Sequence, residues 1–356
     1  MSGRKVTIWC SDVSGIGGQS QVTRHVANLL DADDTVLICY KRYFNFFDLF
    51  TYIISVIRFI RCSLGVSSVV YFVNSRSIVG FIRDFPIYLI VHLTNTKCIV
   101  HSHGSDLISL TREYSILSMV AVFLLRKHVV LVPSQHVSDE LLFVLPKIEV
   151  LENFTEVHED QLAKAKLFNS IQNNEGAIKI AWNSNIIYSK GFFSAVSYIE
   201  NLYTQGIDIE FHVFGIPMAC DYKDLAACEK KFQSFLNVPW FIYRGQVSRS
   251  EVIEALADCS VVALPSFYAS ECQPLALIDA MALGKYLLVS DTPAIRATCS
   301  RYPGTYTLVK EDGSDSDRFI KNARKFLLNS EKSAQHAQDR FSKQRFSERI
   351  IGYLYV

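Results

Sequence analysis

One stretch of the sequence places a carboxylate directly before a predicted helix start. Leu264–Leu275 reads LPSFYASECQPL and follows an apolar run that predicts a buried strand, and Ala276–Leu283 has a helical pattern ending at Gly284. A helix N-terminus offers unpaired backbone N–H groups and a positive dipole end to an anion. The Glu271 carboxylate and these amides therefore suit a ligand that carries a diphosphate and hydroxyl groups.

A second carboxylate follows on the same predicted helix. Asp279 lies eight residues after Glu271, which is a little over two helical turns if both residues are helical. At that spacing the two carboxylates would serve two parts of one extended ligand rather than share a proton. A capped helix with an acidic first turn and no ligand explains the same residues, and this alternative stays open.

Glycines stand between the first predicted strand and the first predicted helix. Ser14–Gln19 reads SGIGGQ, and glycines of this kind let the backbone approach a ligand at a helix N-terminus. A tight turn without any ligand is the alternative. A nicotinamide dinucleotide site would need an acidic residue at the end of the second strand, where Cys39-Tyr40-Lys41 stands instead.

Two histidines and an aspartate follow another predicted strand. His101–Asp106 reads HSHGSD, which makes metal ligation conceivable, but no further ligand cluster stands out in the sequence. The Asp-x-Asp pairs at Asp31–Asp33 and Asp315–Asp317 lie in polar turns and not at the carboxyl ends of predicted strands. We therefore predict no essential metal.

The elements that carry these motifs alternate between strand and helix patterns, which predicts βαβ units and parallel sheets. The polar stretch Phe168–Gly176 interrupts the alternation and predicts a domain linker. The predicted strands before it are Val6–Cys10, Thr35–Tyr40, Ser68–Val73, Lys97–His101, Val129–Val132 and Glu149–Leu151. Those after it are Ile178–Trp182, Ile209–Phe214, Trp240–Tyr243, Ser260–Leu264, Tyr286–Ser290 and Thr305–Leu308. The fold class is thus α/β, with two doubly wound domains.

Composition narrows the function classes. The 356 residues are 49% hydrophobic and carry a net charge of +1, which predicts folded domains and gives no global attraction to nucleic acid. Nine cysteines without a CxxC pair argue against a disulfide framework or zinc site and favour a cytoplasmic location. The apolar runs Leu49–Ile60 and Ile116–Leu125 are too short to span a bilayer.

The segment PSFYASECQPLALIDAMALGK resembles the Glu-x7-Glu signature of glycosyltransferase family 4, the retaining GT-B enzymes that include many bacterial lipopolysaccharide and capsule sugar transferases. Similar matches run through nearly the whole chain. They pair Gly17-Gly18 with the glycine loop, His103-Gly104 with the sugar-side histidine, Val132–Ser134 with "vvPS", Glu149–Asn153 with "vipNgv", Ser189–Gly191 with the "eKG" phosphate motif, Phe214-Gly215 with "ivG", Phe241–Val247 with the base-side loop, and the terminal helix with the family's crossing helix.

The resemblance implies two Rossmann-like domains facing a central cleft: residues 1–168 on the acceptor side, residues 177–336 for the nucleotide-sugar, and residues 337–356 as a helix crossing back. It further implies roles for individual residues. The catalytic residues would be Glu271 at the donor hydroxyls, Lys190 at the diphosphate and His103 near the reacting carbon. Asp279 would bind the ribose, and the other substrate-binding residues would be Gly17, Gly18, Gly245, Gln273, Pro274 and Leu275.

Two departures from the family pattern stand in this region. Ser184-Asn185-Ile186 occupies the place where the family usually has an arginine five residues before the lysine, and Asp279 replaces the second glutamate.

The resemblance also implies a function, which is sugar transfer from a nucleotide-sugar with retention of configuration. The donor is expected to carry UDP rather than GDP, and no further cofactor is expected. The acceptor would be a lipid-linked glycan in O-antigen, capsule or lipopolysaccharide synthesis. A nucleotide-sugar epimerase or phosphorylase on the same fold, and an inactive nucleotide-sugar-binding subunit, are the alternatives.

The helical pattern at Lys41–Arg61 is unusually aromatic and basic. The stripe formed by Phe46, Leu49, Ile53, Val56, Ile57 and Ile60 is expected to pack on the sheet. The opposite stripe, with Phe47, Ile54, Arg58 and Arg61, would cover a neighbouring helix or contact an anionic membrane together with Lys41, Arg42, Tyr43 and Phe44. The second possibility predicts a peripheral position at the inner face of the cytoplasmic membrane.

Overall fold

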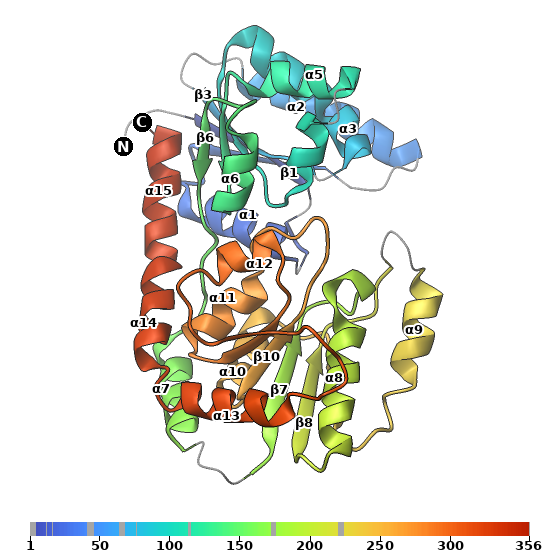
Figure 1. Ribbon diagram of the computed structural model, residues 1–356. Helices are drawn as coiled ribbons and strands as arrows, with labels where there is room; N and C mark the ends of the chain where they lie inside the picture. Colours follow the sequence, from blue (N-terminus) through green and yellow to red (C-terminus); the bar gives the residue numbers. More distant parts are fainter. Residues whose placement is uncertain are drawn as a thin grey trace. The chain divides into compact units, whose positions relative to one another are not determined.

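The structure is a computed structural model. It describes residues 5–11, 13–15, 17–40, 46–63, 68–75, 77–112, 115–171, 176–219 and 224–355, except for the side chains of residues 46 and 47. The chain divides into two compact units (Figure 1). Unit 1 comprises Met1–Asn153 and Gln344–Val356, and unit 2 comprises Phe154–Lys343.

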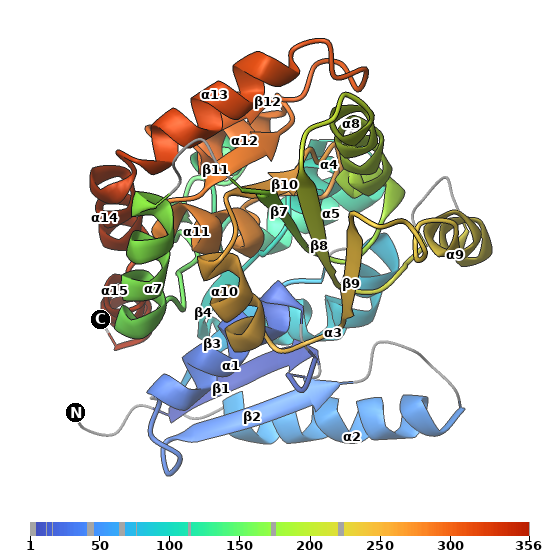
Figure 2. The ribbon, with the colours of Figure 1, turned by 90° about the horizontal axis from the view of Figure 1, so that it is seen from below.

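Unit 1 is built on a six-stranded parallel sheet in the order β2-β1-β3-β4-β5-β6. Its strands are β1 Lys5–Ser11, β2 Thr35–Tyr40, β3 Ser68–Val73, β4 Lys97–His101, β5 Val129–Val132 and β6 Ile148–Val150. Its helices are α1 Gly18–Leu29, α2 Phe46–Ser63, α3 Ile78–Thr94, α4 Asp106–Arg112, α5 Ile116–Leu125, α6 Gln135–Leu141 and α15 Lys343–Tyr355. The helices α1 and α2 lie on opposite sides of β1 and β2 (Figure 2), so the sheet is covered on both faces.

Unit 2 has a second six-stranded parallel sheet in the order β12-β11-β10-β7-β8-β9. Its strands are β7 Ile178–Asn183, β8 Ile209–Phe214, β9 Phe241–Gly245, β10 Val261–Leu264, β11 Tyr286–Val289 and β12 Thr305–Thr307. The helical elements are α7 Glu159–Ser170, the 3-10 turn η1 Tyr188–Lys190, α8 Phe192–Thr204, α9 Leu225–Gln233, α10 Arg249–Ala257, α11 Leu275–Ala282, α12 Pro293–Thr298, α13 Ser316–Leu327 and α14 Glu331–Arg340. The twelve predicted strands are confirmed within a residue or two, as is the α/β class.

The division between the units differs from the predicted linker at Phe168–Gly176. It lies at Asn153, and α7 belongs to unit 2 because its side chains bind other helices of that unit. Lys164 Nζ lies 2.7 Å from Glu254 Oε1, in the C-terminal half of α10, and 2.8 Å from Oδ2 of Asp258, its C-cap residue. A polar stretch in the sequence marks exposure, but it does not show on which core the preceding helix packs.

The terminal helix α15 is part of unit 1. His25 Nε2 on α1 lies 2.9 Å from the Ser347 hydroxyl, and the His25 ring centroid lies 5.9 Å from that of Phe346. Phe346, Ile350 and Leu354 are buried at helical spacing. The last helix was predicted to return to the first domain, and its buried apolar stripe is the side that packs there.

The orientation predicted for the aromatic helix α2 is wrong. Leu49, Ile53 and Ile57, expected against the sheet, are 49%, 47% and 46% exposed. The buried side is instead aromatic, because the rings of Tyr52 and Phe59 pack edge-on against Trp9 of β1. Both sides of this helix are apolar, so the helical period alone could not select the side that packs.

Candidate functional site

The two predicted catalytic charges of unit 2 meet at the point where its strand order reverses. Lys190 follows β7 and Glu271 follows β10, and these strands are neighbours in the sheet although the chain leaves them in opposite directions. Open α/β sheets bind ligands at this crevice outside the carboxyl ends of the strands. Lys190 Nζ lies 3.6 Å from Glu271 Oε2, and both side chains keep part of their surface exposed.

The loops that carry these two residues are joined by backbone contacts. The Phe267 amide donates to the Ser189 carbonyl at 2.9 Å. Gly191 has a φ of 79°, and a Cβ atom there would stand 2.1 Å from the Pro265 carbonyl oxygen. Only glycine fits this approach, because a side chain would strain the backbone and collide with it. The position of Lys190 is thus fixed against the β10 loop.

Hydroxyl groups complete the surroundings of the pair. Lys190 Nζ donates to Ser184 Oγ at 3.0 Å, and Ser266 Oγ donates to Glu271 Oε2 at 3.3 Å. Ser184 lies in the segment where the resembled family usually has an arginine. Lys190 therefore has a hydroxyl acceptor beside it at this position, where the family has a second positive charge. Asn183 Oδ1 and Ser189 Oγ, both beside this site, are buried without a hydrogen-bond partner in the described part of the chain.

The helix N-terminus expected beside Glu271 is present. Pro274 is the N-cap residue of α11 and Leu275 its first residue, while Gln273 is buried just before them. On the other side, the loops after β8 and β9 are joined by the Gly215 amide, which donates to the Gly245 carbonyl at 2.8 Å. The predicted donor-side residues of unit 2 other than Asp279 therefore all lie at the carboxyl ends of β7, β9 and β10.

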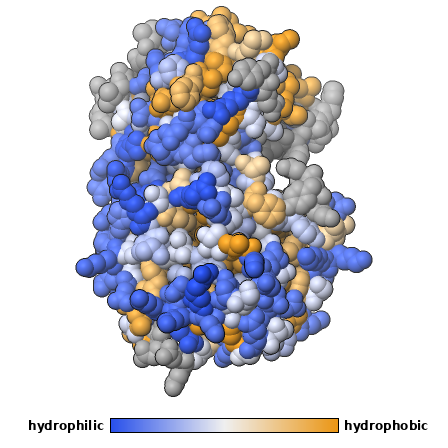
Figure 3. Space-filling view, in the orientation of Figure 1, coloured by the Kyte–Doolittle hydropathy of each residue, from blue (hydrophilic) through white to orange (hydrophobic). Residues whose placement is uncertain are grey.

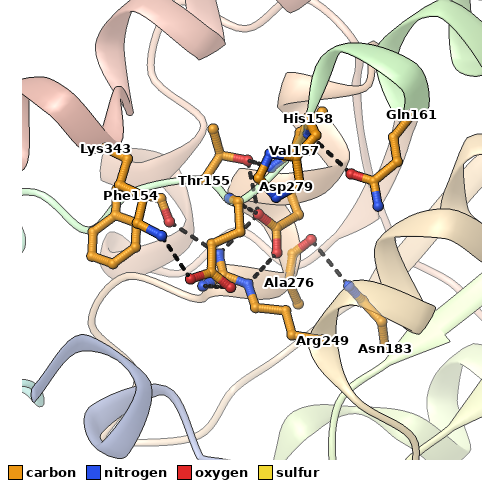
Figure 4. A network of polar contacts seen from close by, with 11 residues as sticks. Phe154, Thr155, Val157, His158, Gln161, Asn183, Arg249, Ala276, Asp279 and Lys343 are labelled. Atoms are coloured by element: carbon orange, nitrogen blue, oxygen red, sulfur yellow. Dashed lines mark hydrogen bonds and ion pairs between the residues drawn. The ribbon is translucent and has the colours of Figure 1, made fainter. Parts of the chain in front are cut away.

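Asp279 has a different environment from Glu271. It is 3% exposed, and the Arg249 guanidinium donates to both of its oxygens, from Nε to Oδ2 at 2.8 Å and from Nη2 to Oδ1 at 2.9 Å (Figure 4). Thr155 Oγ1 also donates to Oδ1, at 2.9 Å. A ribose contact stays a prediction, and it would require a ribose hydroxyl to replace or join these donors.

The Arg249 partner was missed in the sequence. Arg249 is the first residue of α10, and its Nη2 also donates to the Phe154 carbonyl at 3.0 Å. Glu156 lies 3.6 Å from the same guanidinium. An isolated arginine after a predicted strand gives no sign of its carboxylate, so only a map of spatial contacts could find this pair.

In unit 1 the predicted glycine loop begins α1. Gly17 is the N-cap and Gly18 the first helical residue, and a Cβ atom on Gly17 would meet nothing within 4 Å. Arg24, in the second turn of α1, donates to the carbonyl groups of Val13 at 2.6 Å and Gly15 at 2.9 Å. These hydrogen bonds hold the loop in place, and the space next to the Gly17 Cα is open.

His101, the last residue of β4, and His103 have ring centroids 4.1 Å apart and ring planes tilted by 37°. His101 is fully buried, its Nδ1 lies 2.6 Å from the Tyr71 hydroxyl, and burial lowers its pKa to about 3. His101 is therefore a neutral, structural group. His103 remains partly exposed at the carboxyl end of the sheet, where the sequence places a ligand. Within the described ranges no group of three or more His, Cys, Asp or Glu side chains could hold a metal ion.

Comparison with known families decides the class of the protein. Residues 163–343, half of the chain and nearly all of unit 2, match the family described as Glycosyl transferases group 1. The chain belongs to the group 1 glycosyltransferases. The matched range contains both Lys190 and Glu271 as well as the Arg249–Asp279 pair.

One curated relative of this glycosyltransferase is the N,N'-diacetylbacillosaminyl-diphospho-undecaprenol alpha-1,3-N-acetylgalactosaminyltransferase of Campylobacter jejuni. The two are 32% identical over 125 residues, which are 34% of this chain and 31% of the relative. The match thus spans less than a third of the relative's length.

Solved glycosyltransferase structures share the fold across the chain. The crystal structure of Anabaena Alr3699/HepE in complex with UDP and glucose matches with a TM-score of 0.70 and 13% identity, and covers 99% of both chains. Sucrose-phosphate synthase from Thermosynechococcus elongatus matches with a TM-score of 0.68 and 14% identity, covering 99% of this chain and 98% of that one. The glycosyltransferase thus has the two-domain Rossmann-like fold of GT-B enzymes. These comparisons do not favour an epimerase, a phosphorylase or an inactive subunit.

Proposed function

We propose that this glycosyltransferase moves a sugar from a UDP-sugar to a lipid-linked glycan with retention of the anomeric configuration, in the synthesis of a bacterial surface polysaccharide such as O-antigen, capsule or lipopolysaccharide. The observation that carries the proposal is the Lys190–Glu271 pair at the reversal of the strand order in unit 2. A cation and a carboxylate at one crevice suit the two ends of a sugar diphosphate, one anionic and one rich in hydroxyl groups.

Each residue of this crevice has a role that follows from its chemistry. Lys190 neutralises charge on the departing diphosphate as a point charge, and the N-terminus of α11 adds backbone dipoles. Glu271 accepts hydrogen bonds from donor-sugar hydroxyls and so orients the ring. Catalysis then consists of positioning and of electrostatic stabilisation of an oxocarbenium-like carbon and a leaving phosphate, which itself takes the acceptor proton. No step requires a metal.

The residues of unit 1 serve the acceptor side of the reaction. Gly17 leaves room at the N-terminus of α1, which begins at Gly18, for the sugar and its phosphates. His103, which is partly exposed beside a neutral and buried His101, contacts the sugar near the reacting carbon. The name of the Campylobacter relative describes an acceptor with a sugar on a polyprenyl diphosphate, and this supports an acceptor of that chemical class. With such an acceptor, the enzyme would work at the cytoplasmic face of a membrane.

The proposal is tested by screening UDP- and GDP-sugars. A bound donor raises the melting temperature by mass action, so a UDP-sugar that shifts it more than any GDP-sugar identifies the base. Incubation of that donor with polyprenyl-diphospho-sugar acceptors should then yield a longer glycan. Free epimer formed without acceptor, or donor binding with no turnover on any acceptor, would instead establish the epimerase or the binding subunit.

A further inference from the structure

Three neighbouring helices of unit 1 expose an unusual amount of apolar surface. The helices α2, α3 and α5 pack side by side on one face of the sheet, and each exposes several large hydrophobic side chains. Figure 3 shows hydrophobic residues gathered at the end of the molecule where α5 lies. The side chains are Leu49, Phe50, Ile53, Ile54 and Ile57 on α2, Ile78, Val79, Ile82, Phe85, Leu89 and Leu93 on α3, and Ile116, Met119 and Phe123 on α5. We call this set the apolar face. Single exposed apolar residues are common in soluble proteins, but a continuous set across three helices marks an interaction surface.

The apolar face contains a groove. It has a volume of about 440 Å³ and is lined by Phe81, Ile82 and Phe85 of α3 and Ile116, Leu117 and Val120 of α5. All six lining residues are hydrophobic, so the groove offers an occupant no hydrogen-bonding side chain. Hydrophobic material such as a hydrocarbon chain fits a groove of this composition and size.

Exposed charge on these helices is basic only. The acidic residues within them, Asp48 and Asp84, are buried, whereas Arg58 and Arg61 on α2 are exposed. Arg126 and Lys127 directly after α5 are exposed as well. An apolar surface with basic residues beside it is complementary to the anionic headgroups and hydrocarbon of a bilayer.

The groove lies at the functional end of unit 1. The helices α3 and α5 begin after the carboxyl ends of β3 and β4 and lead back to the amino ends of β4 and β5. The residues lining the groove belong to the N-terminal halves of these helices. They therefore lie at the same end of the sheet as His103 and Gly17, where an acceptor is proposed to bind.

We propose that the apolar face is a membrane-docking surface, which lies in the interface of an anionic bilayer with a lipid hydrocarbon chain in the groove. The inference deepens the proposed location at a membrane by naming the surface that makes the contact. Among the described residues no single helix is long and apolar enough to span a membrane, and only the bent pair of α4 and α5 would pass by length and composition together. A second copy of the chain is a less suitable occupant, because a symmetric contact through this face would bring Arg58 and Arg61 of both copies together.

The experiment is sedimentation with vesicles of phosphatidylglycerol or phosphatidylcholine, without sugar nucleotide. The wild type should bind phosphatidylglycerol vesicles at low salt and bind phosphatidylcholine vesicles more weakly. Val79→Ser/Ile116→Ser, at positions 74% and 78% exposed, should bind phosphatidylglycerol about tenfold more weakly. The matched control Val309→Ser/Ile171→Ser makes the same changes at exposed positions of unit 2 and should bind like the wild type.

A charge variant tests the basic part of the surface. Arg58→Glu/Arg61→Glu should weaken phosphatidylglycerol binding more than tenfold. Equal binding by Val79→Ser/Ile116→Ser and the wild type, or no binding by the wild type at low salt, would overturn the inference. A dimer of the wild type that Val79→Ser/Ile116→Ser abolishes in analytical ultracentrifugation would instead assign the face to self-association. If membrane binding fails while a UDP-sugar is still transferred to a water-soluble acceptor, only the docking surface is refuted.

Discussion

The guanidinium of Arg249 donates to both carboxylate oxygens of Asp279, at 2.8 and 2.9 Å, and both side chains are almost entirely buried. The pair joins the start of α10 to the middle of α11, the helix whose N-terminus lies beside Glu271. A buried carboxylate without this partner would carry a large desolvation cost. The shorter aspartate, in place of the usual glutamate, is thus part of a structural ion pair.

Removing one partner of this pair should destabilise the protein strongly. We expect Asp279→Asn and Arg249→Met each to lower the free energy of unfolding by about 3 kcal/mol or more in urea titrations, and the double variant to lose less than their sum. Arg296→Met is the control, because Arg296 and Asp291 form an exposed pair. Such a pair contributes at most about 1 kcal/mol. Strictly additive losses would show that the two side chains are not coupled.

Loss of either charge at the proposed site should reduce turnover without unfolding the protein. A single preorganised charge contact at a reaction centre contributes about 3 kcal/mol, so Glu271→Ala and Lys190→Ala should each lower kcat/KM about a hundredfold. Lys166→Ala removes a comparable but exposed lysine pair with Glu331 and should keep full activity. Activity of Glu271→Ala or Lys190→Ala within a few-fold of the wild type would refute the site.

A methyl group at Gly191 should displace the loops that hold this site. Gly191→Ala would place its Cβ 2.1 Å from the Pro265 carbonyl oxygen, so the backbone has to move and kcat/KM should fall at least tenfold. Gly206→Ala is the matched control, since Gly206 has a similar φ of 85° but open space around it. It should lose only the roughly 1 to 2 kcal/mol of stability expected for left-handed backbone. Equal kinetics of the two variants would contradict the close fit of the loops.

The product should keep the anomeric configuration of the donor, and the reaction should not need a metal ion. The coupling constant of the anomeric proton in the NMR spectrum of the isolated product measures the first. Full activity after dialysis against EDTA measures the second. An inverted anomeric centre would exclude the proposed mechanism, and inactivation by EDTA that manganese reverses would show a metal-dependent one.

The buried lysine of unit 2 should make stability depend on pH. Lys285 is fully buried, with Nζ donating to Asn169 Oδ1 at 2.8 Å and to the Ala257 carbonyl at 2.7 Å, and burial lowers its pKa to about 7. The unfolded chain, where the lysine has its ordinary pKa near 10.5, binds more protons between these values. Stability from this group therefore rises with pH above 7, and below 7 the full cost of burying the ammonium remains.

Lys285→Met isolates this effect. The variant lacks the charge, so its stability relative to the wild type should decrease between pH 7 and pH 9, by on the order of 1.4 kcal/mol per pH unit in urea titrations. Lys166→Met, which removes an exposed lysine, should show no such trend. A difference between Lys285→Met and the wild type that does not change with pH would mean that the folded protein keeps the proton on Lys285 throughout this range.

The strands were predictable because parallel sheets covered on both faces need continuous apolar runs. Every residue of β3 and of β10 is buried, for example, and such runs stand out between helical segments. Glu271 was a candidate from its own surroundings, because it lies between a predicted strand and a predicted helix start, whereas Lys190 was a candidate only through the family resemblance. Features that depend on contacts between distant segments were not predictable. The Arg249–Asp279 pair and the burial of Lys285 leave no local pattern.

The orientation of α2 shows the same limit in another form. A helix with apolar residues on both sides has no preferred side in the sequence, and the aromatic partner Trp9 that selects Tyr52 and Phe59 lies on β1. The outward position of Ile53 and Ile57, which no periodicity argument supplied, is part of the surface proposed to meet the membrane. The residues Lys41, Arg42, Tyr43 and Phe44, which the sequence also assigned to that contact, lie outside the described residues.

The helix α15 belongs to unit 1 although all of unit 2 precedes it in the chain. During synthesis, the contact between Phe346 and His25 can therefore form only after unit 2 has left the ribosome. Domains usually fold in the order in which they are made. Here we expect the inserted unit to reach its native state first, and the unit containing the N-terminus to be completed last.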